Sequence, residues 1–102
     1  MDISSFRESV SGGRYFVTAH AKQRMGQRKV SDDDVKWVIL QGETIENHPD
    51  AYPFPKALFM AVVRENPLYV SASFDGQFAY IITVHWFDPE VWIDAVTRRK
   101  SR

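Results

Sequence analysis

Residues 68–86, LYVSASFDGQFAYIITVHW, decide the fold of this chain. From 68 to 74, apolar and more polar side chains alternate, which is typical of a strand with one buried face. Asp75-Gly76 is a strong hairpin signal, and residues 78–86 form the returning strand. The stretch therefore predicts two antiparallel strands.

The length of the hairpin loop decides which side chains share a face. A two-residue loop would place Phe74 opposite Gln77 and scatter the polar groups. A three-residue loop with a bulge places Phe74 opposite Phe78 and also pairs Val70 with Ile82. We expect the three-residue loop.

This register gives the two strands one less apolar face. Tyr69 would lie opposite Thr83 on it and diagonal to His85. The side chains expected on this face are Tyr69, Ser71, Ser73, Thr83 and His85.

The residues before the hairpin predict two further strands. Residues 57–63 are a short, nearly continuous apolar run, consistent with a central strand covered on both faces. Residues 43–48 alternate loosely, and the proline-punctuated segment 49–55 fits a loop and no central strand. We therefore expect about four strands.

Two helices are predicted before the strands. Ser31 and Asp34 form an S-x-x-D capping box ahead of the apolar residues of 35–39, and Gly42 is the natural stop. Residues 18–28 favour a preceding helix whose first residue is an N-cap type. After residue 42 the helical period gives way to alternation.

Together these elements predict an α+β fold: two N-terminal helices packed on a curved antiparallel β-sheet of about four strands, with a short C-terminal helix over residues 90–96. At 102 residues the chain fits a single domain, 1–102, with its core at about 14–96. Residues 1–13 are expected as an arm or a short helix, and residues 97–102 as a basic tail.

Composition excludes several classes of protein. The apolar fraction is 44% and the charged fraction 25%, the balance of a folded globular chain. The absence of cysteine excludes disulfides and thiolate metal sites and favours a cytoplasmic location. Residues 1–13 do not form a secretory signal, and no apolar run is long enough to span a membrane. We expect a soluble protein without a membrane partner.

Charge is distributed unevenly, although the formal net charge is zero. Residues 1–29 hold six basic and two acidic side chains, residues 30–94 hold three and eleven, and residues 95–102 hold four and none. If the two basic ends meet in space, they form a positive patch able to contact phosphates. The alternative is a solvated tail over residues 98–102.

The strongest polar constellation is His20, Arg24 and Arg28, which lie four residues apart and therefore share one helix face. In an RNA-cleaving site, a histidine can take the 2′-hydroxyl proton or protonate the leaving oxygen. Arginine side chains neutralise the charge that develops on the phosphorane. The alternative is an amphipathic helix with a basic polar face, in which His20 caps or packs near the helix start.

His85 and Tyr69 are further candidates, one on each strand of the hairpin. His85 can reach an open sheet face, and Tyr69 could stack on a base or donate a hydrogen bond to phosphate. The alternative is that both are half-buried residues that fill space against the helices. His48, beside Pro49 in a loop, is expected on the surface.

We expect no metal and no cofactor. The three histidines, at positions 20, 48 and 85, form no close pair, and the aspartates at 32–34 suit the start of a helix. The chain has no G-x-G-x-x-G, P-loop or G-x-S-x-G motif, which argues against nucleotide-cofactor chemistry.

Several segments of the chain together form a recognisable pattern: 20–28 (HAKQRMGQR), 30–31 (VS), 34–35 (DV), 42–46 (GETIE), 67–68 (PL) and 81–84 (IITV). The signature is H-A-x-x-R-M-x-x-R followed by a helix and G-E-x-I-E. With this pattern, the chain resembles the small bacterial domain-of-unknown-function family 4258 over about residues 18–92. That family is similar to the RelE/barnase/EndoU-like group of ribonuclease and toxin folds, which implies helices packed on a curved antiparallel sheet.

The resemblance implies that His20, Arg24 and Arg28 are signature residues. The chain departs from the family pattern at two positions: Tyr69 stands where the family commonly has histidine, and His85 where it commonly has tyrosine. If the two positions share a face, this exchange between neighbouring strands preserves a His/Tyr pair. Otherwise it argues against catalysis.

The leading hypothesis is a metal-independent ribonuclease or toxin-like domain, with His20 or His85 as general acid or base. The candidate site comprises catalytic His20, His85 and Tyr69, and phosphate-binding Arg24 and Arg28. A competing hypothesis is a non-catalytic module that binds a protein, such as a cognate antitoxin-like partner, through an open sheet face or an edge strand. A third is a homodimer formed through residues 78–86.

Overall fold

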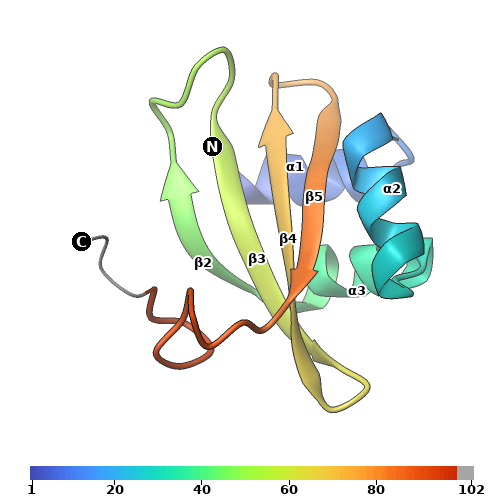
Figure 1. The fold of residues 1–102 in the computed structure, drawn as a ribbon. Coiled ribbons are helices and arrows are strands. Elements are labelled where there is room, and N and C mark those ends of the chain that lie inside the picture. Colours follow the sequence, from blue (N-terminus) through green and yellow to red (C-terminus); the bar gives the residue numbers. More distant parts are fainter. Residues whose placement is uncertain (99–102) are drawn as a thin grey trace.

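The computed structural model describes residues 1–98, which form three helices and one five-stranded sheet (Figure 1). The helices are α1 (Ile3–Ser11), α2 (Ala19–Arg28) and α3 (Asp32–Gln41). The strands are β1 (Tyr15–Val17), β2 (Glu43–His48), β3 (Lys56–Val63), β4 (Asn66–Phe74) and β5 (Ala79–Trp86). The α+β class is confirmed. Of the expected basic tail, residues 99–102 lie outside the described part.

The predicted helices α2 and α3 begin at the expected caps. Thr18 Oγ1 accepts a hydrogen bond from the backbone N–H of Ala21 at 3.1 Å. Ser31 and Asp34 form the predicted capping box, in which each side chain accepts a hydrogen bond from the other residue's backbone N–H. Gly42 caps the C-terminal end of α3, as expected.

Gly42 also lets the end of α3 lie close to β3. A Cβ atom here would lie against the carbonyl oxygens of Val38 and Met60, closer than Cβ atoms approach such atoms in real proteins. We expect Gly42→Ala to lower the free energy of unfolding by about 1–3 kcal/mol. Gly26→Ala is the control, because its Cβ would meet nothing within 4 Å. Replacing this helical glycine should raise the free energy of unfolding by up to about 1 kcal/mol.

Urea denaturation measures both glycine variants. Equal unfolding free energies for the two would contradict the close approach of α3 to β3.

The N-terminal segment forms a third helix, which is one of the two forms expected for residues 1–13 and makes the prediction of two N-terminal helices one too few. In α1, Phe6 and Val10 are buried in the main core, and the Phe6 ring stacks on Phe59 with centroids 5.0 Å apart. Two buried hydrophobic residues in a nine-residue helix give too little periodicity to separate a core helix from a loose arm.

The sheet also differs from the predicted antiparallel one of about four strands. Its order is β1-β5-β4-β3-β2, with β1 parallel to β5 and the other neighbours antiparallel. β1 was missed because a three-residue strand is too short to show alternation. β1 is the edge strand beside β5, so helix α2, which directly follows β1 in the sequence, begins next to β5.

The expected C-terminal helix over residues 90–96 is wrong. Asp94 Oδ1 accepts hydrogen bonds from the backbone N–H groups of Val96 and Thr97, at 2.9 Å each. Aspartate side chains that bond nearby backbone groups in this way compete with helix formation. The segment therefore forms turns, but its apolar side chains do pack inward, as expected for Val91, Trp92 and Ala95.

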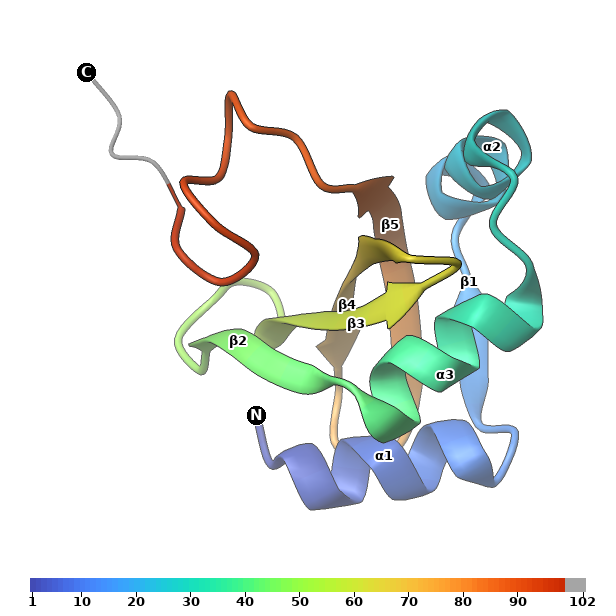
Figure 2. The ribbon, with the colours of Figure 1, turned by 90° about the horizontal axis from the view of Figure 1, so that it is seen from below.

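Opposite faces of the sheet are covered by different parts of the chain (Figure 2). Helices α1 and α3 cover one face, and residues 87–98, here called the C-terminal segment, lie over part of the other. β3 is therefore covered on both faces, as predicted: Phe59 packs toward the helices and Met60 toward the C-terminal segment. We call the uncovered remainder of the second face the open face.

The hairpin register differs from the predicted one. Asp75 Oδ1 accepts hydrogen bonds from two backbone N–H groups of the loop, at 2.8 and 2.7 Å, which closes a loop of four residues. Phe74 therefore pairs with Ala79 and not with Phe78. The bulge lies within β5, at Ile82, and not in the loop.

The bulge changes the pairing further along the hairpin. Val70 lies opposite Val84, and Ser71 opposite Thr83. Tyr69 lies directly opposite His85, where a diagonal relation was expected. The two residues are therefore cross-strand neighbours on one face.

Candidate functional site

A cleft of about 660 Å³ lies at the open face, between α2 and the C-terminal segment. Thr83 and His85 of β5 line its floor. One wall is the face of α2 that carries the predicted constellation: His20, Arg24 and Arg28. The structure thus brings four of the five predicted site residues together, from a helix and a strand far apart in sequence.

Helix α2 begins where the edge strand β1 ends, and hydrogen bonds then hold it beside β5. The Thr18 hydroxyl donates a hydrogen bond to the carbonyl oxygen of Ile82 at 3.3 Å. One N–H group of the Arg28 guanidinium donates to the carbonyl oxygen of Val84. Trp86 Nε1 in turn donates to the carbonyl oxygen of Arg28 at 3.0 Å. Both ends of α2 are therefore tied to β5.

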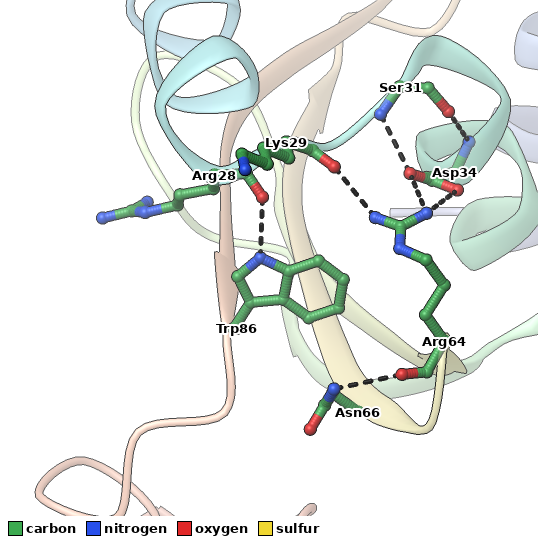
Figure 3. Close-up of polar contacts among 7 residues, drawn as sticks. All are labelled: Arg28, Lys29, Ser31, Asp34, Arg64, Asn66 and Trp86. Carbon is green, nitrogen blue, oxygen red and sulfur yellow. Dashed lines mark hydrogen bonds and ion pairs between the residues drawn. The ribbon is translucent and has the colours of Figure 1, made fainter.

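A second arginine braces the end of α2 from the other side (Figure 3). Arg64 donates hydrogen bonds to the carbonyl oxygen of Lys29 at 2.8 Å and to the Asp34 carboxylate at 3.0 and 3.2 Å. Its guanidinium also lies over the Trp86 ring, 5.5 Å from the centroid. The Arg28 side chain leaves α2 on the side away from Arg64. The brace fixes the backbone of Arg28 while its guanidinium lines the cleft.

The cleft is positively charged. Within residues 1–98 it is lined by three guanidinium groups, those of Arg24, Arg28 and Arg98, and by the single carboxylate of Asp88. Arg24 donates to Gln27 Oε1 at 2.8 Å, and His20 is exposed at the rim. An excess of cations beside two histidines suits an anionic ligand.

His85 is partly buried at the floor of the cleft. Its ring stacks on Tyr69, with centroids 5.0 Å apart and planes 3° from parallel. Burial lowers the pKa of His85, the charges of Arg28 and Arg98 lower it further, and Asp88 opposes them. The imidazole is therefore neutral at neutral pH, and its nitrogens make no hydrogen bond within the described residues. A neutral imidazole in this state can accept a proton.

Tyr69 does not lie where a substrate could touch it. Its side chain is fully buried between His85 and Trp92, and its hydroxyl donates a hydrogen bond to the carbonyl oxygen of Ala95 at 2.6 Å. The expectation that Tyr69 stacks on a base or bonds phosphate is therefore wrong. The cause is the C-terminal segment, which the sequence did not place over this face. Tyr69 instead supports the ring of His85.

Arg98 is a cleft residue that the sequence placed only in a basic tail. It donates two hydrogen bonds to the Glu46 carboxylate, at 2.8 and 3.1 Å, and its guanidinium lies 4.7 Å from the Trp92 ring centroid. The Arg98 hydrogen bonds are the main cause of the lowered pKa of Glu46. Arg98 lines the cleft opposite α2, so at this one residue the two basic ends of the chain meet, a possibility that the sequence left open.

A smaller pocket of about 260 Å³ continues the cleft across the open face. The two share Thr83, His85 and Arg98. The smaller one extends to Ser71 of β4 and to His48 of β2. His48 is exposed, as predicted. The accessible surface therefore runs from α2 across the sheet toward β2.

Neither a metal centre nor a membrane span is visible in the described part of the chain. Within residues 1–98, no three side chains of histidine, aspartate or glutamate are grouped as metal ligands would be. None of the described helices is long and apolar enough to cross a membrane.

Fold and site define an α+β domain that carries a cationic, histidine-containing cleft on the open face of a mixed sheet. The chain belongs to the family described as "Domain of unknown function (DUF4258)", whose model matches residues 17–86. This confirms the resemblance seen in the sequence. No curated protein and no solved structure matches the chain. The matched range includes α2 and β5, whereas Arg98 and Trp92 lie outside it.

Proposed function

We propose that this protein binds RNA in the cleft and cleaves it without a metal ion. The observation that carries this proposal is the meeting of the His20, Arg24 and Arg28 face with His85 in one cleft. Two imidazoles provide the two proton transfers that RNA cleavage by the 2′-hydroxyl requires. Guanidinium groups provide the charge that stabilises a pentacoordinate phosphorane.

The proposed reaction is an intramolecular transesterification. His85 takes the proton of the 2′-hydroxyl, whose oxygen then attacks phosphorus to form a 2′,3′-cyclic phosphate. The bond from phosphorus to the 5′-oxygen breaks, and His20 donates a proton to that leaving oxygen. Assignment of His85 as the base rests on its lowered pKa, which keeps it neutral. Proton return from His85 to His20 through solvent completes the cycle.

The arginines have distinct roles in this proposal. Arg28 already uses one N–H group on the Val84 carbonyl, so its position is fixed before substrate binds. Arg24, one helical turn earlier, hydrogen-bonds only a side-chain amide within the described residues and can turn its fork toward phosphate. A fixed and an adaptable guanidinium together hold one phosphodiester.

Arg24→Ala tests the phosphate contact. We expect it to reduce cleavage of a mixed RNA substrate in EDTA about 10- to 100-fold, the effect of losing one hydrogen bond to a charged group. Lys22→Ala is the matched control, because Lys22 is an exposed cation of the same helix that does not line the cleft. Gel electrophoresis of the RNA measures both rates.

Equal loss in the two variants would mean that the total charge matters and not the cleft. Intact RNA with every protein, wild type included, would exclude cleavage and leave a non-catalytic binding module as the function of this site.

A further inference from the structure

An exposed row of aromatic rings lies on the open face, outside the cleft. Phe16 of β1 stacks beside Tyr80 of β5 with centroids 5.7 Å apart, and Tyr80 stacks beside Phe54 at 6.4 Å. Phe78 supports Phe16 from the loop, at 5.4 Å. We call Phe16, Tyr80 and Phe54 the aromatic row.

The ends of the aromatic row are open to solvent. Phe16 is 54% exposed and Phe54 is 42% exposed. The Tyr80 hydroxyl donates to the Asp75 carboxylate at 3.0 Å, which fixes the central ring. A rigid stack with exposed end rings can be extended by another flat ring at little cost in conformational entropy.

The aromatic row and the cleft share one face of the sheet. Tyr80 lies opposite Ser73, and His85 opposite Tyr69, and these β4 residues are on the same side because they are separated by an even number of positions. Between them lie Ser71 and its partner Thr83, whose small side chains line the smaller pocket on this face. Because of the bulge at Ile82, Tyr80 and His85 pair with β4 residues only four positions apart, a distance of roughly 13 Å.

A cation stands beside the aromatic row as well. Lys56 of β3 is the cross-strand neighbour of Ser73, which is the neighbour of Tyr80. Lys56 is exposed and lines the pocket that continues the cleft. Lys56 therefore places a positive charge near the end of the open face opposite Arg28, in a pocket where the Glu46 carboxylate is paired with Arg98.

We propose that the aromatic row is a base-binding subsite for single-stranded RNA. Bases of nucleotides flanking the scissile phosphate stack on the exposed ends of the row, while the backbone crosses the open face from the cleft to Lys56. The strand must be unpaired, because bases in a duplex do not offer free ring faces. This inference rests on the proposed function, since it takes the phosphodiester in the cleft as its starting point.

The test is the affinity for a labelled single-stranded RNA that 2′-O-methyl groups protect from cleavage. We expect Phe16→Ala to weaken binding about five- to hundredfold in fluorescence anisotropy. Trp37→Ala is the matched control, because Trp37 is equally exposed, at 54%, but lies on α3, which covers the opposite face. Phe54→Ala probes the other end of the row if Phe16→Ala does not fold.

Further measurements separate the possible outcomes. An oligonucleotide with abasic sites should bind wild type and Phe16→Ala alike, and a dinucleotide substrate, which fills only the cleft, should be cleaved at the same rate by both.

Affinity that falls in Arg24→Ala but not in Phe16→Ala or Phe54→Ala would overturn the subsite and leave the cleft intact. A dimer of wild type that Phe16→Ala converts to monomer would identify the row as a contact between copies and overturn the inference. Base-dependent binding without cleavage by wild type would instead refute the ribonuclease proposal.

Discussion

His85→Gln is expected to reduce RNA cleavage about 100- to 10,000-fold, the usual contribution of a general base. Glutamine keeps a planar group of similar size on the Tyr69 ring but cannot take up the proton of the 2′-hydroxyl. Lys36→Gln is the control, because Lys36 lies on α3, which covers the opposite face of the sheet. Initial rates with saturating RNA measure the loss, and an unchanged rate in His85→Gln would remove this residue from the chemistry.

The lowered pKa of His85 adds a pH dependence to this prediction. The neutral imidazole is the active form, and a lowered pKa lets that form persist below pH 6.5, the ordinary value for histidine. For wild type, the acid limb of kcat/KM should therefore lie below pH 6.5. Arg98→Met removes one of the cations that depress this pKa, so the acid limb should move to higher pH. An acid limb that does not respond to Arg98 would assign the titration to another group.

Trp92→Ala is expected to have the largest effect on stability, a loss of about 3–5 kcal/mol. Trp92 is fully buried, with Tyr69 stacked on it at a centroid distance of 4.7 Å and Arg98 lying over its ring. It is the anchor that holds the C-terminal segment on the sheet. Since a domain has only about 5–15 kcal/mol of stability, this loss should lower the midpoint of urea unfolding clearly.

Trp92→Phe separates packing from polar contacts at the same site. The Trp92 Nε1 atom is buried without a hydrogen-bond partner within the described residues. Phenylalanine removes this unsatisfied donor and keeps an aromatic ring, so its cost should be much smaller than that of alanine. If the two variants are equally stable, the ring of Trp92 does not anchor the segment.

Elements with strong local signals could be predicted from the sequence. The Thr18 cap sets the start of α2, and the Ser31 capping box sets the start of α3, because capping depends on residues within one turn. The C-terminal segment could not be predicted, because the side chain of Asp94 competes with the helix and its anchor Trp92 depends on a distant sheet face. The register failed for a similar reason, since the side chain of Asp75 lengthens the loop by one residue.

The candidate site was predictable to the extent that it lies on one helix. His20, Arg24 and Arg28 share a face because of their spacing, whatever the tertiary structure. The role of Tyr69 was mistaken because its burial comes from residues more than 20 positions away in sequence. Arg98 was invisible as a cleft residue for the same reason, although the unequal charge of the chain had suggested that its ends could meet. The His/Tyr exchange between strands does preserve a pair, since Tyr69 and His85 stack on one face.

Binding of a phosphodiester between α2 and β5 is the central claim, and a titration followed by NMR tests it most directly. The chain has only three histidines, so the imidazole resonances of His20, His48 and His85 can be followed individually. The ligand is a 2′-O-methyl dinucleotide, which cannot be cleaved. The account predicts that the resonances of His20 and His85 shift together with one affinity while those of His48 stay in place. A titration in which neither His20 nor His85 responds would contradict it.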